Sequence, residues 1–208
     1  MTDHRIFLGV GSNVQREAHI DIALNMLGEH LRDLRCSPVY ESESLDGEHP
    51  PFFNLVVSAT TDLSARELIG WLKEIEELHG RRRGAQSLIA LDIDLLLFDD
   101  FAGLVDGVRV PRGEILTRAF VLYPLQLLAP QLRHPEFGLS MVELWKQLRP
   151  GPALAPVRFQ FGPPHSVGAG LSCDEPLRRT AQRSPIAPRS GTAARSFAGK
   201  PRSYSDRA

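Results

Sequence analysis

The sequence, 208 residues long, contains only two cysteines, Cys36 and Cys173, and it lacks any long apolar run. Cysteines so few and so far apart exclude a disulfide-rich scaffold and the closely spaced ligand pairs of a zinc site or a redox motif. No apolar stretch approaches the ~18–20 residues of a membrane-spanning helix, and the apolar stretch within residues 1–13 is too short for a signal peptide. These absences predict a protein of the reducing cytoplasm with no membrane partner.

Several motifs of nucleotide-binding and hydrolytic enzymes are also missing. The sequence has no Gly-x-x-x-x-Gly-Lys phosphate loop, no Gly-x-Gly-x-x-Gly fingerprint and no Gly-x-Ser-x-Gly elbow. Its histidines show no spacing of paired ligands, which disfavours a zinc site. Any chemistry must therefore come from another combination of residues.

Positive charge is scarce in the first three quarters of the chain and gathers at its end. Residues 163–208 hold 8 basic and 3 acidic residues, which leaves 16 basic and 22 acidic residues in 1–162, a net charge of −6. An acidic body argues against nucleic acid as its partner. The segment 163–208 is rich in Pro, Gly, Ser and Arg without apolar periodicity, so we predict a folded domain over 1–162 and a disordered tail. The alternative for the tail is a weak RNA-binding or acid-binding arm.

Alternating strands and helices are predicted in the body. Strands are expected at 5–10, 34–41, 52–60 and 91–98, and helices at 14–31 and from Ser64, where Glu67 completes a capping box, to Gly80. The order β-α-β-β-α-β indicates an α+β protein with a ferredoxin-like core, an antiparallel sheet and both helices on one face. A C-terminal helical extension is expected at 115–128, broken at Pro124, and at 140–148, followed by a last strand at 157–161.

Two acidic residues stand in an apolar strand. In Leu91-Asp92-Ile93-Asp94-Leu95, alternation places Asp92 and Asp94 on one face, ~6.5–7 Å apart. Carboxylates so close repel each other and lose hydration, and a divalent cation between them relieves both penalties. Mg²⁺ with nucleotide phosphates suits so few hard oxygen ligands. The alternative is a solvated strand face or salt bridges to arginine.

Arginines surround this pair in the sequence. Arg81-Arg82-Arg83 follows the second helix and precedes the acidic strand, and Arg109, Arg112 and Arg118 come after it. Guanidinium groups bind phosphate oxygens in a planar fork, which favours a phosphate-binding role. The alternative is that cations at a helix C-terminus complement its macrodipole.

Two further polar residues are candidates for ligand contacts. Glu76 lies at the flank of an apolar helix face, where it either accepts a hydrogen bond from a ligand or is solvated. Asn54 alternates with Phe52 and Val56 on one strand face, and a flat heterocycle with adjacent donors and acceptors would satisfy its amide. The alternative for Asn54 is a structural hydrogen bond to backbone.

In order along the chain, these pieces resemble the hydroxymethyl-dihydropterin pyrophosphokinases of folate biosynthesis. The likeness runs from about Arg5 to Phe161 and rests on six motifs: Phe7-Leu8-Gly9-Val10-Gly11-Ser12-Asn13, Tyr40-Glu41-Ser42, Phe52-Phe53-Asn54, Ile75-Glu76 with Gly80-Arg81, Leu91-Asp92-Ile93-Asp94, and Arg118-Ala119-Phe120-Val121-Leu122-Tyr123-Pro124-Leu125.

The resemblance implies transfer of a pyrophosphoryl group from ATP, the co-substrate, to 6-hydroxymethyl-7,8-dihydropterin, with release of AMP. It implies that Asp92 and Asp94 hold two Mg²⁺ ions and that Arg81 and Arg83 are catalytic residues at the phosphates. The pterin would be bound by Ser42, Leu45, Phe52 (where a Tyr is usual), Asn54 and Phe120. ATP would be bound by Glu76, Leu95, Arg112 and Arg118.

Two stretches depart from the family pattern. Residues 84–90 replace the usual Arg-Trp-Gly-Pro-Arg-Thr, and Pro111-Arg112 replaces a usual Pro-His. Alternatives therefore stay open: a slower paralogue acting on another pterin alcohol, a pterin- or nucleotide-binding regulator, or a nucleotide-sugar transferase, whose Asp-x-Asp also binds a metal diphosphate. A monomer or weak dimer is expected.

Overall fold

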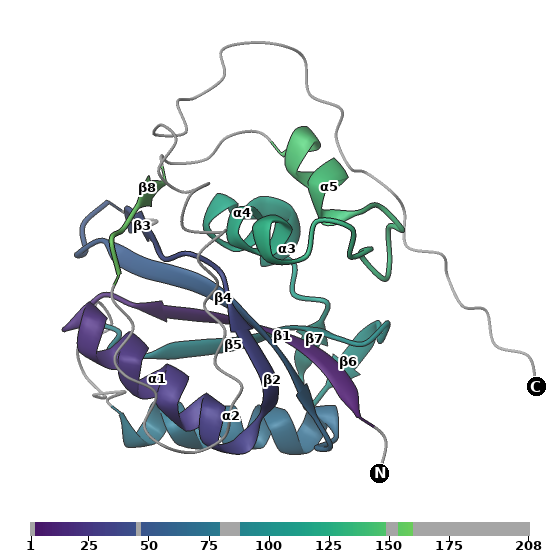
Figure 1. The fold of residues 1–208 in the computed structure, drawn as a ribbon, viewed down its shortest axis with the longest axis horizontal. Coiled ribbons are helices and arrows are strands. Elements are labelled where there is room, and N and C mark those ends of the chain that lie inside the picture. The colour runs from purple at the N-terminus through teal and green to yellow at the C-terminus, as the bar shows by residue number, and fades with distance from the viewer. Residues whose placement is uncertain (1–2, 45–46, 80–87, 149–153, 160–208) are drawn as a thin grey trace, which may run out of the picture.

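The computed structural model describes residues 3–44, 47–79, 88–148 and 154–159 (Figure 1). The site residues predicted at Leu45, Arg81 and Arg83 lie outside this part of the chain, as does the tail from 163 to 208. Within the described ranges no helix is both long enough and apolar enough to cross a membrane.

In chain order the elements are β1 (His4–Ser12), α1 (Arg16–His30), β2 (Arg32–Cys36), β3 (Tyr40–Ser42), β4 (Phe52–Thr61), α2 (Ala65–Leu78), β5 (Asp92–Phe98), β6 (Gly103–Val105), β7 (Val108–Val110), α3 (Glu114–Thr117), α4 (Ala119–Leu128), α5 (Met141–Gln147) and β8 (Ala155–Pro156).

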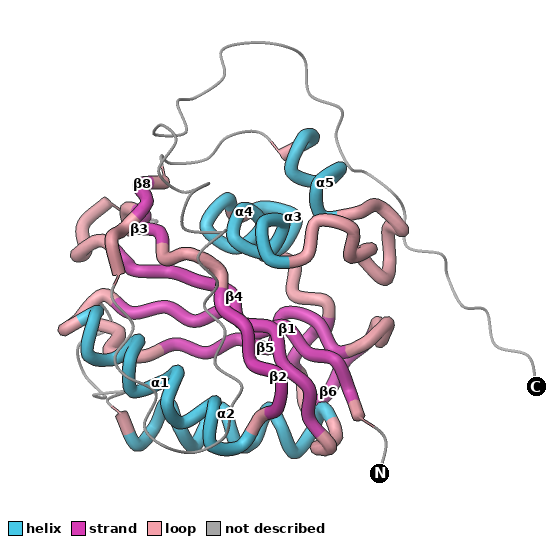
Figure 2. Tube along the Cα trace, in the orientation of Figure 1, coloured by secondary structure: helices cyan, strands magenta, loops and turns pink. Residues whose placement is uncertain are grey.

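An antiparallel sheet forms the centre of the fold. Its strand order is β5-β1-β4-β3-β8, and β2 pairs with β4 beside β3. Helices α1 and α2 cover one face, so the predicted β-α-β-β-α-β core of an α+β protein is confirmed (Figure 2). Helix α2 begins at the predicted capping box, in which Ser64 accepts from the Glu67 amide and the Glu67 carboxylate accepts from the Ser64 amide.

The opposite face of the sheet is covered by α3, α4 and α5 (Figure 1). Alternation along β4 sends Phe53, Leu55 and Val57 into the core beneath α1 and α2, while Val56 enters the core beneath α4. The helical extension therefore buries the second sheet face, and the sheet is apolar on both sides. Asn54 also lies on the α4 face, so its side-chain amide is surrounded by the apolar residues of that face.

The strand predicted over 34–41 is two strands, and the prediction of a single one was wrong. Ser37 interrupts the ladder: its amide donates to the Val56 carbonyl at 2.8 Å, and its hydroxyl accepts from the Val56 amide at 2.9 Å. Pro38 follows and has no N–H to donate. The chain bends there, and β3 then pairs with β4 and with β8.

The extension also differs from its prediction at two points. The helix over 115–128 breaks at Arg118, which is extended at φ −116° and ψ 117°, while Pro124 lies inside α4. α4 continues through the proline because Leu122 and Leu125 are fully buried there. The last strand in the described part of the chain is Ala155–Pro156, and residues 157–159 form none; residues 160 and 161 of the predicted strand lie outside that part.

The short hairpin of β6 and β7 was not predicted. Its turn contains Asp106-Gly107, both with positive φ, between Val105 and Val108. Asp-Gly between two β-branched residues is a strong signal for a two-residue hairpin, so the sequence did hold this information.

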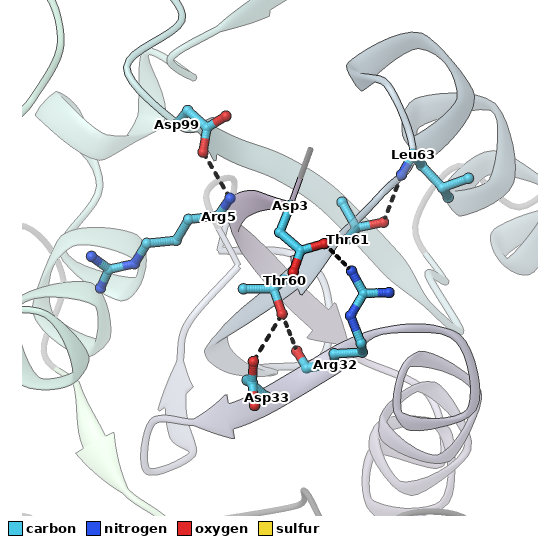
Figure 3. A network of polar contacts seen from close by, with 8 residues as sticks. All are labelled: Asp3, Arg5, Arg32, Asp33, Thr60, Thr61, Leu63 and Asp99. Carbon is cyan, nitrogen blue, oxygen red and sulfur yellow. Dashed lines mark hydrogen bonds and ion pairs between the residues drawn. The ribbon is translucent and has the colours of Figure 1, made fainter. Parts of the chain in front are cut away.

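Polar contacts hold together the end of the sheet where β1 begins (Figure 3). The Arg5 amide donates to the Asp99 carboxylate at 2.7 Å, and the Thr60 hydroxyl donates to the Asp33 carboxylate at 3.0 Å. Arg32 also forms an ion pair with Asp3. The candidate site lies at the other end of β1, near Ser12.

Candidate active site

The two carboxylates of β5 face the same way. β5 pairs with β1 in the register Gly11↔Asp92, Val10↔Ile93 and Gly9↔Asp94, and Ile93 enters the core beneath α1 and α2. Asp92 and Asp94 therefore point to the α4 side. Leu95 enters the same core as Ile93 and is 3% exposed, so its side chain faces away from the carboxylates and only its backbone is placed to meet a nucleotide.

Glycines on β1 separate the carboxylates from Asn54. On its other edge β1 pairs with β4 in the register Gly11↔Asn54, which places Asp92, Gly11 and Asn54 in one cross-strand row. With strands ~4.8 Å apart, the outer two residues of the row are roughly 10 Å apart at their Cα atoms. A Cβ on Gly11 would meet Asn54 Oδ1 at 3.4 Å. The glycine thus keeps a strip of bare backbone between the acidic pair and the amide.

The side-chain amide of Asn54 donates hydrogen bonds within the protein, whereas its oxygen accepts none from the described residues. Its Nδ2 donates to Ser42 Oγ at 3.0 Å and more weakly to the Phe52 carbonyl at 3.4 Å. Within the described ranges no group donates to its Oδ1. Asn54 is 8% exposed, and its Oδ1 is an acceptor that an N–H donor of a ligand could use.

Aromatic residues of β3 and α4 lie on the same side of the sheet. Tyr40 pairs with Asn54 in register and is buried against Tyr123 of α4, with ring centroids 5.2 Å apart. Burial is the main cause that raises the pKa of the Tyr40 phenol. Phe120, second residue of α4, is half-buried and packs against the cores on this face. Sequence reasoning missed Tyr40 as part of this row.

Arg112 forms an ion pair with one of the two aspartates, Asp94. Its Nη2 lies 3.0 Å from Asp94 Oδ1 and 3.2 Å from Glu114 Oε1. Burial raises the pKa of Asp94, and the Arg112 guanidinium acts in the opposite direction. The net result is a raised pKa for Asp94, because burial outweighs the guanidinium and Glu114 adds to its effect.

Glu76 and Arg118 flank the site from two helices. Glu76 is half-buried, and its Oε1 accepts from the Ile93 amide at 2.7 Å, so it ties α2 to β5 between the two aspartates. Arg118 is the half-buried N-cap residue of α4 and forms no hydrogen bond or ion pair to another described side chain.

Asn13 is a residue whose role sequence reasoning missed. Asn13 does not cap α1, because the N-cap of that helix is Gln15, which has no side-chain cap hydrogen bond. The Asn13 side chain instead accepts from the Ile89 amide at 2.6 Å. The position of an Asn directly after a strand gave no hint of this partner, which lies 76 residues away.

The donor set fits magnesium chemistry. Within the described ranges no three side chains of His, Cys, Asp or Glu gather into one metal site. A pair of hard carboxylates is a donor set that suits Mg²⁺, which keeps waters and takes substrate phosphates as its other ligands. The fold and the site together define an α+β protein with two carboxylates on β5 and a side-chain amide on β4, in neighbouring positions across β1.

Comparison with known proteins gives the family. Residues 7–130 match the family described as 7,8-dihydro-6-hydroxymethylpterin-pyrophosphokinase (HPPK). The chain is 33% identical over 154 residues to the 2-amino-4-hydroxy-6-hydroxymethyldihydropteridine pyrophosphokinase of Aquifex aeolicus, covering 73% of this chain and 94% of that protein. It is 36% identical over 146 residues to the protein of the same name in Pseudomonas aeruginosa, covering 67% and 89%. The chain belongs to the HPPK family, a family of transferases.

A solved structure supports the fold. The Plasmodium falciparum HPPK-DHPS crystal structure aligns with a TM-score of 0.59 at 15% identity, over 70% of this chain and 45% of that one. At so low an identity the likeness concerns the architecture alone. The sheet with helices on both faces is therefore the architecture of a known HPPK structure.

Proposed function

We propose that this chain carries out the reaction of its family, with the residues described above in specific roles. The reaction is ATP-dependent transfer of a pyrophosphoryl group to the hydroxyl of 6-hydroxymethyl-7,8-dihydropterin, a step of folate biosynthesis. The hydroxyl oxygen attacks the β-phosphorus of ATP, the bond from that phosphorus to the oxygen bridging to the α-phosphorus breaks, and AMP leaves. The hydroxyl proton passes to solvent.

One observation carries the proposal: the row Asp92–Gly11–Asn54 across three strands. It supports a pterin edge at Asn54 and a metal-bound triphosphate at Asp92 and Asp94, joined over the bare backbone of Gly11. A reaction whose chemistry is mostly positioning and charge neutralisation requires the two substrates to lie side by side. The glycine provides the room for this contact.

The pterin is proposed to bind on the α4 face of β4. Asn54 Oδ1 would accept from the heterocycle, and its Nδ2 is oriented by Ser42. Phe52, on the same strand face as Asn54, and Phe120 of α4 would supply apolar contacts. Leu45 is proposed to border the same pocket on the basis of the family pattern.

The phosphates are proposed to bind between the acidic pair and the arginines. Mg²⁺ held by Asp92 and Asp94 would neutralise charge as it develops. Arg81, Arg83, Arg112 and Arg118 would serve as further cationic partners of the triphosphate. Glu76 and the backbone of Leu95 would border the nucleotide. A cytoplasmic location and a monomer or weak dimer stay predictions.

The test is product analysis with the intact chain, ATP, MgCl₂ and hydroxymethyl-dihydropterin. We expect AMP and the pterin diphosphate in equal amounts, and a loss of turnover of roughly 100-fold or more in Asp92→Asn and in Asp94→Asn. Asp100→Asn, an exposed residue just beyond the other end of β5, is the matched control and keeps its activity. Release of ADP would contradict pyrophosphoryl transfer, and substrate binding without turnover would identify a regulator.

A further inference from the structure

We propose that Arg112 forms an ion pair with Asp94 while nucleotide is absent. When nucleotide binds, the Arg112 side chain leaves Asp94 and contacts the phosphates instead. Metal then binds this chain together with the nucleotide and only weakly before it. This inference rests on the proposed function, because it assigns Asp94 to the metal. It concerns a residue in which the chain departs from the family resemblance, with Arg112 in place of the usual His.

The placement of Arg112 makes the contact with Asp94 a defined one. Its backbone amide donates to the Leu96 carbonyl at 3.0 Å, which anchors the residue to β5 two positions beyond Asp94. From there Nη2 reaches Asp94 Oδ1 at 3.0 Å. The side chains of Arg112 and Asp94 are 27% and 37% exposed, so water screens this pair only in part.

The guanidinium uses few of its donors. The same Nη2 atom is shared between Asp94 and Glu114, and the buried Nε has no hydrogen-bond partner within the described ranges. An arginine offers five N–H donors in a planar fork, and an unsatisfied buried donor carries an energetic penalty. Phosphate oxygens would satisfy these donors better than the present single-atom contact, which makes a change of partner favourable once they arrive.

Metal and guanidinium compete for the same carboxylate. A dication on Asp94 would place like charges side by side in a partly desolvated site, so Arg112 has to leave before the metal binds there. A triphosphate changes this balance because it supplies negative charge to both cations at once. Histidine at this position would be a weaker competitor, since it is largely neutral near pH 7.

The experiment measures Mg²⁺ binding calorimetrically, with and without α,β-methylene-ATP, whose α–β linkage the reaction cannot break. We expect weak Mg²⁺ binding to the free wild-type chain and roughly tenfold tighter binding in free Arg112→Gln. Arg112→Lys keeps a positive charge and is expected to bind Mg²⁺ like wild type. Arg66, at the start of α2, forms an ion pair with Asp106. Arg66→Gln therefore removes one positive charge outside the site, and as the matched charge control it should leave the Mg²⁺ affinity unchanged.

Combining Arg112→Gln with Asp94→Asn should abolish the tighter Mg²⁺ binding of Arg112→Gln. That result would show that the tighter binding depends on the Asp94 carboxylate. Equal Mg²⁺ affinity of free wild type and Arg112→Gln would overturn the proposal. A second measurement does not depend on folding of the Arg112 variant. Asp94→Asn alone should weaken Mg²⁺ binding roughly tenfold with the analogue and hardly at all without it; an equal loss in both conditions would also overturn the proposal.

AMP release by the wild-type chain separates this inference from the proposed function. If AMP forms and Asp92→Asn abolishes it while the Arg112 variant binds Mg²⁺ as wild type does, only the role of Arg112 is wrong. If Mg²⁺ does not bind even with the analogue, both the metal assignment and this inference fail.

Discussion

Asn13 and Ile89 are joined by two hydrogen bonds. The Asn13 amide donates to the Ile89 carbonyl at 2.9 Å, and the Ile89 amide donates to Asn13 Oδ1 at 2.6 Å. The pair links the end of β1, just beyond Gly11, to the segment that leads into Asp92. Asn13 is 5% exposed and Ile89 is 36% exposed, so loss of the Asn13 side chain would leave a part-buried Ile89 amide without this acceptor. Asn13 therefore helps to position the acidic pair from outside the site.

Replacing Asn13 by Ala should loosen this link. We expect the Ile89 amide to exchange hydrogen at least roughly tenfold faster, and stability to fall by about 0.5–1.5 kcal/mol. Hydrogen-exchange NMR and urea unfolding measure the two effects. Asn13→Asp keeps an acceptor and should restore most of the protection, whereas Asn25→Ala on the surface of α1 serves as the control. Unchanged exchange at Ile89 in Asn13→Ala would rule out the linking role.

Gly11→Ala should affect the pterin more than ATP. The new methyl group would lie 3.4 Å from Asn54 Oδ1 and narrow the strip between the amide and the acidic pair. We expect KM for the pterin to rise roughly tenfold with little change in KM for ATP, as measured by AMP release. Gly70→Ala on α2, where a Cβ meets nothing within 4 Å, should leave both KM values unchanged and stabilise the fold by about 0.5–1 kcal/mol. Equal increases in both KM values would indicate a general distortion of the sheet.

Two substitutions of Glu76 should distinguish its structural role from a ligand-binding role. Its carboxylate accepts from the Ile93 amide at 2.7 Å, and a Gln side chain offers an acceptor of the same reach. Glu76→Ala is expected to lose about 1–2 kcal/mol in urea unfolding, and Glu76→Gln much less. Nucleotide affinity measured on Glu76→Gln then reports any direct contact. If both variants unfold alike, the hydrogen bond to β5 does not stabilise the fold.

His134 should make stability depend on pH. It is 1% exposed, its Nε2 has no hydrogen-bond partner within the described ranges, and burial lowers its pKa below the usual value of about 6.5. Glu136 and Arg109, which form an ion pair beside it, act on this pKa in opposite directions. A base with a lowered folded-state pKa contributes stability that is complete above about pH 6.5 and is lost as pH falls toward the folded pKa.

We therefore expect the free energy of unfolding to fall as the pH drops below about 6.5, and His134→Gln to flatten this part of the profile. Urea unfolding at several pH values measures it. His30→Gln, at an exposed position at the end of α1, is the control and should keep the wild-type slope. An identical slope in His134→Gln would assign the pH dependence to other groups.

Local patterns in the sequence were enough for the α+β core. Period-2 alternation gave the two faces of β4 and the shared face of Asp92 and Asp94, because neighbouring side chains on a strand must alternate. The capping box at Ser64 marked the start of α2 through contacts within one turn. These features depend only on residues a few positions apart, so the chain encodes them without reference to the rest of the fold.

Strand pairing and packing decided what local patterns could not. Residues distant in sequence meet only through the sheet register, which places Asn54 beside Gly11 and Gly11 beside Asp92. The break at Arg118 rather than Pro124 depends on burial on both sides of α4. The amino acids by themselves thus determined which face of a strand each candidate residue occupies, whereas tertiary structure decided its neighbours, because strand register brings together segments that are distant in the sequence.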